Sequence, residues 1–130
     1  MSRVPTSLAA KVRARAGRRC EYCLLPEMAT QASFEVEHIV PLKHEGPTTL
    51  DNLAFACFHC NRHKGVNLCG LHPLTGKLVR LFNPRHDEWS RHFRLVSGRL
   101  SGRTDIGKAT IRVLEMNKLE QVQLRKLWLI

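Results

Sequence analysis

The middle of the chain concentrates side chains that bind metals or move protons. The candidates are Glu37, His38, Asn52, Asn61 and His63. A neutral imidazole, with a pKa near 6.5, can take a proton from water. Carboxylate and amide oxygens are the ligands that a hard divalent cation such as magnesium prefers. Together such groups could activate water and neutralise charge on a leaving oxygen, as hydrolysis of a phosphodiester requires.

Four of the five cysteines form two C-x2-C pairs, Cys20 with Cys23 and Cys57 with Cys60. Two such pairs can supply four thiolates to one tetrahedral zinc ion, which closes the coordination shell and makes the ion structural. The alternative is two unrelated pairs of free thiols. The intervening segment is longer than the roughly 15 to 20 residues of a simple zinc ribbon, so further structure is expected between the pairs. Cys69 has no paired neighbour and is expected to be a small buried apolar residue.

The composition favours one domain with a basic surface. The 130 residues and a hydrophobic content of 43% are enough for a modest core. Lysine and arginine outnumber aspartate and glutamate by 21 to 11, and the formal charge of +10 favours a polyanionic partner, either nucleic acid or an anionic membrane surface. No apolar run reaches about 18 residues and the N-terminus lacks an apolar secretory signal, so we expect a cytoplasmic protein without a membrane segment. A reducing cytosol also favours metal thiolates over disulfides.

The pattern around the polar groups predicts a strand, a long loop, a second strand and a short helix. Alternating β-branched residues predict a strand that ends before Pro41, and the apolar segment 53–57 predicts the second strand. The helix would begin at the second cysteine pair and end or bend near Gly65. A separate N-terminal helix is predicted from about Thr6 to Gly17.

The sequence of the C-terminal extension, residues 68–130, predicts strands followed by helices. A hairpin is expected to turn near Thr75, and "FRLV" and "RLSG" predict two further strands. Two helices separated by a break near Asn117 complete the chain. The expected fold class is therefore α+β, in one domain that combines an N-terminal helix (1–19), a central core (20–67) and this extension.

Three motifs in the central core, "EHIVP", "LDNLAFAC" and "CFHCNRHKG", together resemble a known family. They are similar to the HNH endonuclease motif of the ββα-metal superfamily, in the branch where two C-x2-C pairs bind structural zinc. The resemblance covers about residues 20–65. It implies a small ββα-metal core stapled by zinc. It also implies a metal-dependent nuclease, with DNA expected rather than RNA as substrate, that leaves 5′-phosphate and 3′-hydroxyl ends.

The resemblance also implies a role for each candidate residue. His38 would be the general base, and Asn52 would hold the loop and help to orient the histidine. Glu37 stands where the family commonly has aspartate and would bind the catalytic metal. Asn61 would be the second metal ligand, where many relatives have histidine, and His63 is the alternative. An oxygen-rich Glu/Asn pair favours magnesium or manganese over softer ions.

Basic residues in and around the motifs are candidates for contacts with a nucleic-acid backbone. They are Arg18, Arg19, Lys64, Arg85, Arg91 and Arg94. Such contacts position a nucleic acid without reading its sequence, and the alternative is that these side chains are simply solvated. Two other functions stay open: a zinc-stabilised nucleic-acid-binding module without cleavage activity, and a protein–protein scaffold. The set formed by Glu37, His38, Asn52 and Asn61 favours the nuclease, since neither alternative needs it.

Overall fold

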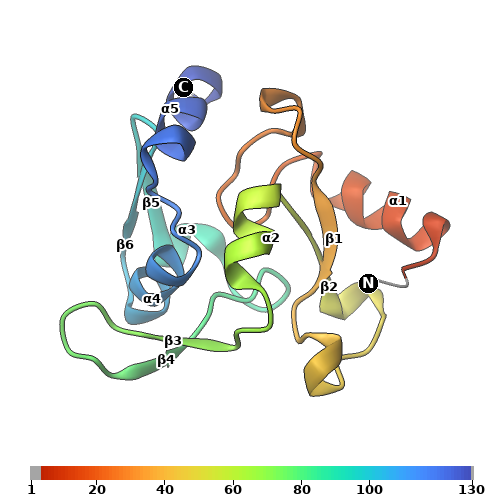
Figure 1. Ribbon diagram of the computed structural model, residues 1–130, viewed down its shortest axis with the longest axis horizontal. Helices are drawn as coiled ribbons and strands as arrows, with labels where there is room; N and C mark the ends of the chain where they lie inside the picture. The colour runs from red at the N-terminus through yellow and green to blue at the C-terminus, as the bar shows by residue number, and fades with distance from the viewer. Residues whose placement is uncertain (1–3, 130) are drawn as a thin grey trace.

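The computed structural model describes residues 4–129, so the first three residues of the predicted N-terminal segment and the last residue of the extension lie outside it. The helices are α1 (Thr6–Arg15), α2 (Phe58–Lys64), α3 (Trp89–His92), α4 (Asp105–Val113) and α5 (Leu119–Trp128), and the strands are β1 (Glu35–His38), β2 (Leu53–Ala56), β3 (Cys69–Leu71), β4 (Leu78–Arg80), β5 (Phe93–Val96) and β6 (Arg99–Gly102). Short 3-10 helices span Glu27–Ala29, Leu42–His44 and Leu50–Asn52. This order confirms the α+β class (Figure 1).

The strands β1 and β2 pair antiparallel, and α2 follows directly, which gives the expected ββα arrangement. All four residues of β2 are buried, because helices cover both faces of the pair. Val12 of α1 packs against Leu53 and Phe55 on one face. On the other face, Ala54 and Ala56 join the core that contains the cysteine pairs. The sequence of a strand that is buried on both faces is a continuous run of apolar residues, as in "LAFA".

The C-terminal extension forms two hairpins and two longer helices that share a core with the central segment. β3 pairs with β4 and β5 pairs with β6, both antiparallel. Phe82, Phe93 and Leu114 belong to the same buried cluster as Tyr22 and Leu25. The indole Nε1 of Trp89 also donates a hydrogen bond to the carbonyl of Tyr22, at 2.9 Å. The extension is therefore packed on the segment that carries the first cysteine pair.

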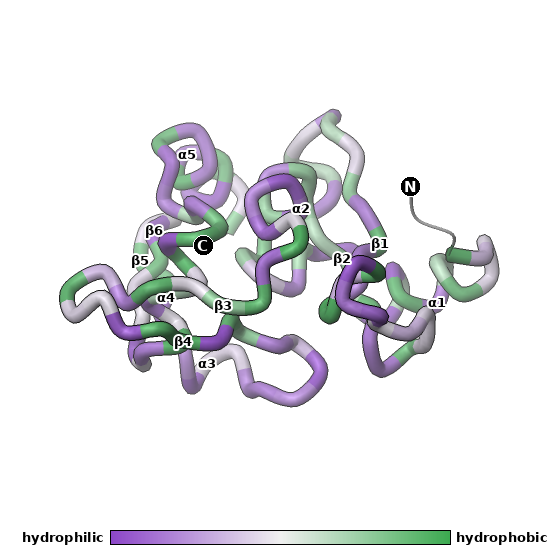
Figure 2. Tube along the Cα trace, turned by 60° about the horizontal axis from the view of Figure 1, so that its bottom comes forward, coloured by the Kyte–Doolittle hydropathy of each residue, from purple (hydrophilic) through white to green (hydrophobic). Residues whose placement is uncertain are grey.

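Cys69 is exposed, and the prediction of a buried apolar residue at this position is wrong. In a strand, alternate residues face opposite sides. In β3 it is Gly70 that faces inward, where an added Cβ would lie 2.3 Å from Val113 of α4. Leu71 and Leu78 are paired across the hairpin and are also exposed, and Figure 2 shows hydrophobic residues along both strands.

The helices are short, and the longest of those in residues 4–129 have ten residues. Within this part of the chain, none combines the length and the apolar character needed to cross a bilayer.

Arg85 connects the extension to the core through a largely buried ion pair with Glu21. The side chains of Arg85 and Glu21 are 13% and 12% exposed, and Glu21 also accepts a hydrogen bond from the backbone N–H of Phe55, at 2.8 Å. The proposed contact between Arg85 and a nucleic-acid backbone is not compatible with this placement, because its guanidinium is already engaged inside the fold. Arg91, by contrast, is 73% exposed.

These placements predict that two arginine substitutions differ in their effect on stability. Arg85→Met should lower the free energy of unfolding by about 3 kcal/mol, because it leaves the carboxylate of Glu21 buried without its cation. Arg91→Met should change it by no more than about 0.5 kcal/mol. Urea unfolding of both variants measures the difference. Equal stability of the two variants would contradict the buried ion pair.

Candidate nuclease site

The sulfur atoms of the four paired cysteines form one cluster. The Sγ atoms of Cys20, Cys23, Cys57 and Cys60 all lie within 4.8 Å of one another, and all four residues are buried. The Sγ atoms of Cys23 and Cys57 are 3.8 Å apart. Tetrahedral zinc with Zn–S bonds of about 2.3 Å separates its sulfur ligands by about 3.8 Å, so the donor set and its dimensions fit zinc. The predicted four-cysteine cluster is confirmed.

Local backbone structure positions each cysteine pair. In the first pair, Leu24 adopts a left-handed conformation with φ of 69°, and its N–H donates to the carbonyl of Cys20. The N–H of Cys23 also points to the sulfur of Cys20, at 3.4 Å. In the second pair, Cys57 caps α2, since its sulfur accepts from the N–H of Cys60 at 3.3 Å. Such N–H groups offset part of the charge of a thiolate.

A separate cavity of about 390 Å³ brings three of the predicted catalytic residues together. Glu37 and His38 lie at the end of β1, and Asn61 lies in the middle of α2. Neighbours on a strand face opposite sides, but the strand ends at His38, and both side chains reach the wall of the same cavity.

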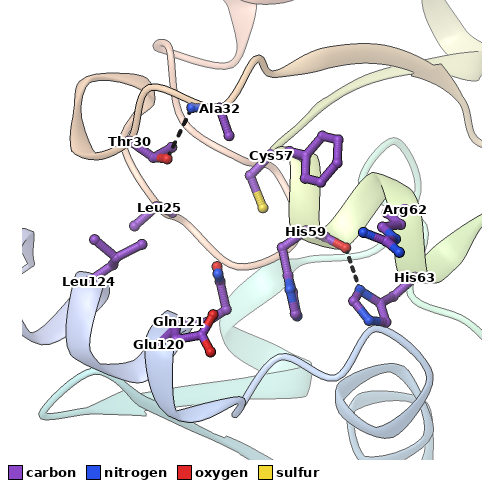
Figure 3. Close-up of a pocket in the computed structure, with 11 residues that line it drawn as sticks. Leu25, Thr30, Ala32, Cys57, His59, Arg62, His63, Glu120, Gln121 and Leu124 are labelled. Atoms are coloured by element: carbon purple, nitrogen blue, oxygen red, sulfur yellow. Dashed lines mark hydrogen bonds between the residues drawn. The ribbon is translucent and has the colours of Figure 1, made fainter.

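His63 lies on the other side of α2, against the C-terminal extension (Figure 3). Its Nδ1 is 2.8 Å from the carbonyl oxygen of His59, and its Nε2 is 3.3 Å from a carboxylate oxygen of Glu115. Side chains two positions apart on an α-helix point in directions that differ by about 200°, so Asn61 and His63 face opposite ways. Of the two alternative metal ligands, only Asn61 lines the cavity with Glu37, and the assignment of His63 is not supported.

The imidazole of His38 is held by the loop that follows β1. Its Nε2 lies 2.8 Å from the hydroxyl of Thr48. Burial lowers the pKa of His38 below its ordinary value, and the positive charge of Lys64 lowers it further. The ring is therefore neutral at neutral pH, as a group that accepts a proton must be.

Asn52 ties together the two ends of this loop. Its Oδ1 accepts a hydrogen bond from the N–H of Val40 at 2.9 Å, and its Nδ2 donates to the carbonyls of Val40 at 3.1 Å and Pro47 at 2.8 Å. Gly46 is needed inside the loop, because an added Cβ would lie 1.7 Å from the carbonyl oxygen of Val40. Asn52 thus fixes the segment that presents Thr48 to His38.

The carboxylate of Glu37 is buried between two partners, Tyr22 and Lys64, and neither contact was predicted from the sequence. One oxygen accepts a hydrogen bond from the phenol of Tyr22, and the other lies 3.0 Å from the ammonium of Lys64. Burial raises the pKa of Glu37, and both partners oppose that rise. Lys64 is 2% exposed and also donates to the carbonyl of Ile39 at 3.0 Å. The proposed phosphate contact of Lys64 is therefore not compatible with its position.

The remaining candidates for nucleic-acid contacts lie on the surface. Arg18, Arg19, Arg91 and Arg94 are exposed. Their side chains are free to meet a phosphate, unlike those of Lys64 and Arg85.

The buried ion pair between Lys64 and Glu37 should contribute to stability. Lys64→Met should lower the free energy of unfolding by about 3 kcal/mol or more, because the charge of Glu37 loses its partner. The double variant Lys64→Met/Glu37→Gln should be more stable than the single variant, since no buried charge is left unpaired. Denaturant unfolding of both variants tests this. Wild-type stability of Lys64→Met would show that the pair does not form.

Comparisons with known proteins agree with this arrangement. Residues 20–67 match a family model described as HNH endonuclease. The chain is also 30% identical over 107 residues to a protein from Bacillus thuringiensis described as Septu protein PtuB. That alignment covers 80% of the chain and 38% of the relative, so the chain spans well under half of the relative's length. No solved structure gives a significant match.

Proposed function

Because residues 20–67 match the model of the HNH endonuclease family, we propose that this protein is a metal-dependent endonuclease that hydrolyses phosphodiester bonds in DNA. The observation that carries the proposal is the cavity shared by Glu37, His38 and Asn61. It combines a neutral imidazole with two oxygen donors, and these are the groups that activation of water and binding of a hard cation require.

In this proposal His38 accepts a proton from the attacking water. The ring would carry its own proton on Nε2 and donate it to the hydroxyl of Thr48, which leaves Nδ1 to act as the base. Asn52 supports this step indirectly, because its three hydrogen bonds fix the loop that carries Thr48. Asn52 is accordingly a positioning residue.

Glu37 and the side-chain oxygen of Asn61 would hold a divalent magnesium or manganese ion. When bound, the ion would stabilise the negative charge that develops on the leaving oxygen. Each oxygen of Glu37 keeps a lone pair beyond the one used by Tyr22 or Lys64, so the donor set fits such an ion. Since Lys64 already balances the charge of Glu37, the two residues attract a cation less than a free carboxylate would. Substrate phosphate is expected to complete the ligand set.

We also propose that the four-cysteine cluster holds a structural zinc ion. All four sulfurs are buried and would close the coordination shell, so the ion would take no part in hydrolysis. Thiolates of this kind persist in a reducing compartment, and the cytoplasmic location expected from the sequence belongs to the same proposal.

One observation favours a second candidate, a zinc-stabilised nucleic-acid-binding module. The charge of Glu37 is balanced inside the protein by Lys64, and a metal site could be weakened by this pairing. Binding would then use exposed cations such as Arg18, Arg19 and Arg91. Such binding weakens steeply with salt and needs no divalent ion.

Plasmid cleavage separates the two candidates. Zinc-loaded wild type should nick supercoiled DNA with Mg²⁺ or Mn²⁺ and not with EDTA, and His38→Ala should reduce the rate by about 10² or more, because no base remains to accept the proton. His86→Ala is the matched control, since His86 is exposed and outside the cavity, and it should retain activity. Salt-sensitive DNA binding by wild type without cleavage under either metal would favour the binding module, and RNA would be the next substrate.

The pH dependence of cleavage follows from the environment of His38. Its pKa is lowered from 6.5 by burial and by Lys64, so the ring loses its proton at a lower pH than an ordinary histidine. Cleavage requires the neutral ring, and kcat/KM should rise with pH to a plateau with a midpoint below 6.5. The measurement is a profile at constant ionic strength and saturating metal. A midpoint above 6.5 would argue against the buried His38 as the base.

A further inference from the structure

Arg125 is a fully buried charged residue without an acidic partner in the described part of the chain. It lies on α5 and has no measurable exposure. Its Nε donates to the carbonyl of Gly98 at 2.8 Å, and its Nη2 donates to the carbonyl of Met116 and, at 3.5 Å, to the side-chain oxygen of Asn117. None of the ion pairs in residues 4–129 includes it. Neutral carbonyls solvate a guanidinium but do not balance its charge, so its burial calls for a negative partner.

One nitrogen of the guanidinium, Nη1, also lacks a hydrogen-bond acceptor within the residues that the structure describes, and it is buried. An unsatisfied buried donor costs about 1 to 3 kcal/mol, and more when the group is charged. The hydrogen bonds to Gly98 and Met116 therefore do not account for why an arginine occupies this position.

The helix that carries Arg125 packs beside the cysteine cluster. Figure 3 shows Gln121 and Leu124 of α5 on the wall of a cavity whose opposite wall includes Leu25 and Cys57. Met116, whose carbonyl Arg125 binds, belongs to the same buried cluster as all four cysteines. Leu124, the residue before Arg125 on α5, is half-buried and packs against this cluster as well.

A zinc ion bound by four thiolates carries a net charge of about −2, and here it would be fully buried. Backbone N–H groups at Cys23 and Cys60 offset part of that charge. The other fully buried cation in residues 4–129, Lys64, is already paired with Glu37. Arg125 is thus the buried cation whose charge is unbalanced, and it lies beside the centre whose charge is of opposite sign.

We propose that Arg125 is the internal counter-charge of the four-cysteine zinc centre, so that zinc binding and docking of the C-terminal helix α5 stabilise each other. The proposal rests on the structural zinc inferred above. It makes α5 part of the metal site although none of its residues is a ligand. Loss of the metal would leave Arg125 buried without compensation and would release α5 from the core.

The experiment compares full-length variants loaded with Zn²⁺ or with Co²⁺, whose thiolate charge-transfer band reports on the sulfurs. Arg125→Met should weaken Zn²⁺ affinity by about tenfold or more in chelator competition and shift the Co²⁺ band, whereas Arg125→Lys should stay within about threefold of wild type because it keeps the charge. Lys126→Met, an exposed change on the same helix, should alter neither.

Thr104→Ala controls for a general loss of stability. Thr104 caps α4 by accepting a hydrogen bond from the backbone N–H of Gly107, whereas the hydrogen bonds of Arg125 go to Gly98, Met116 and Asn117. This variant should lower the free energy of unfolding by about 1 kcal/mol without a shift of the Co²⁺ band. An Arg125→Met protein with an unshifted band, and with no greater loss of affinity than Thr104→Ala, would overturn the proposal.

Two further outcomes are decisive. If Arg125→Met does not fold, Arg125→Lys decides, and a tenfold loss of Zn²⁺ affinity in that variant would overturn the counter-charge. If wild type binds no Co²⁺ with a four-thiolate spectrum, the zinc assignment fails and this inference fails with it. Failure of the zinc assignment can be told apart from failure of the counter-charge alone. In the second case wild type binds the metal, and Arg125→Met binds it in the same way.

Discussion

The convergence of four cysteine sulfurs is the constraint on which the rest of the structure depends. It joins a turn near the N-terminus to the start of α2 across an insert that contains both strands of the central pair. Because Cys57 both ends the β2 segment and caps α2, the sulfur cluster also sets where the strand stops and the helix starts. The cavity with Glu37, His38 and Asn61 lies between α2 and β1, the strand that pairs with β2.

Buried charge is the second organising feature. Three cations, Lys64, Arg85 and Arg125, lie largely or fully inside a protein with a formal charge of +10. Each is placed at a connection between segments: α2 with β1, the extension with the first cysteine pair, and α5 with the turn before it. In the interior such charges are costly when they lose their partners, so an arrangement of the segments that separated them would be unfavourable. The basic composition therefore serves the fold as well as the surface.

Much of the fold could be predicted from the sequence because its signals are local. The spacing of Cys20, Cys23, Cys57 and Cys60 indicated one cluster, and alternation and turn residues indicated the order of strands and helices. The choice between Asn61 and His63 depends on which face of α2 meets β1, which spacing along the chain does not reveal. The burial of Lys64 and Arg85 depends on carboxylates 27 and 64 residues away. Nothing close to either residue in the sequence signals that partner.

Residues 20–23 perform three tasks in four consecutive positions. Cys20 and Cys23 belong to the sulfur cluster, Glu21 holds Arg85, and Tyr22 donates its phenolic hydrogen to Glu37. No flexible segment separates the sulfur cluster from the carboxylate of the cavity, since the tyrosine between two cluster residues touches that carboxylate directly. A displacement of the sulfurs would therefore also move Tyr22, and with it one of the two groups that hold the carboxylate of Glu37. Through this tyrosine, the sulfur cluster contributes to the position of a side chain in a cavity of which none of the four cysteines is part.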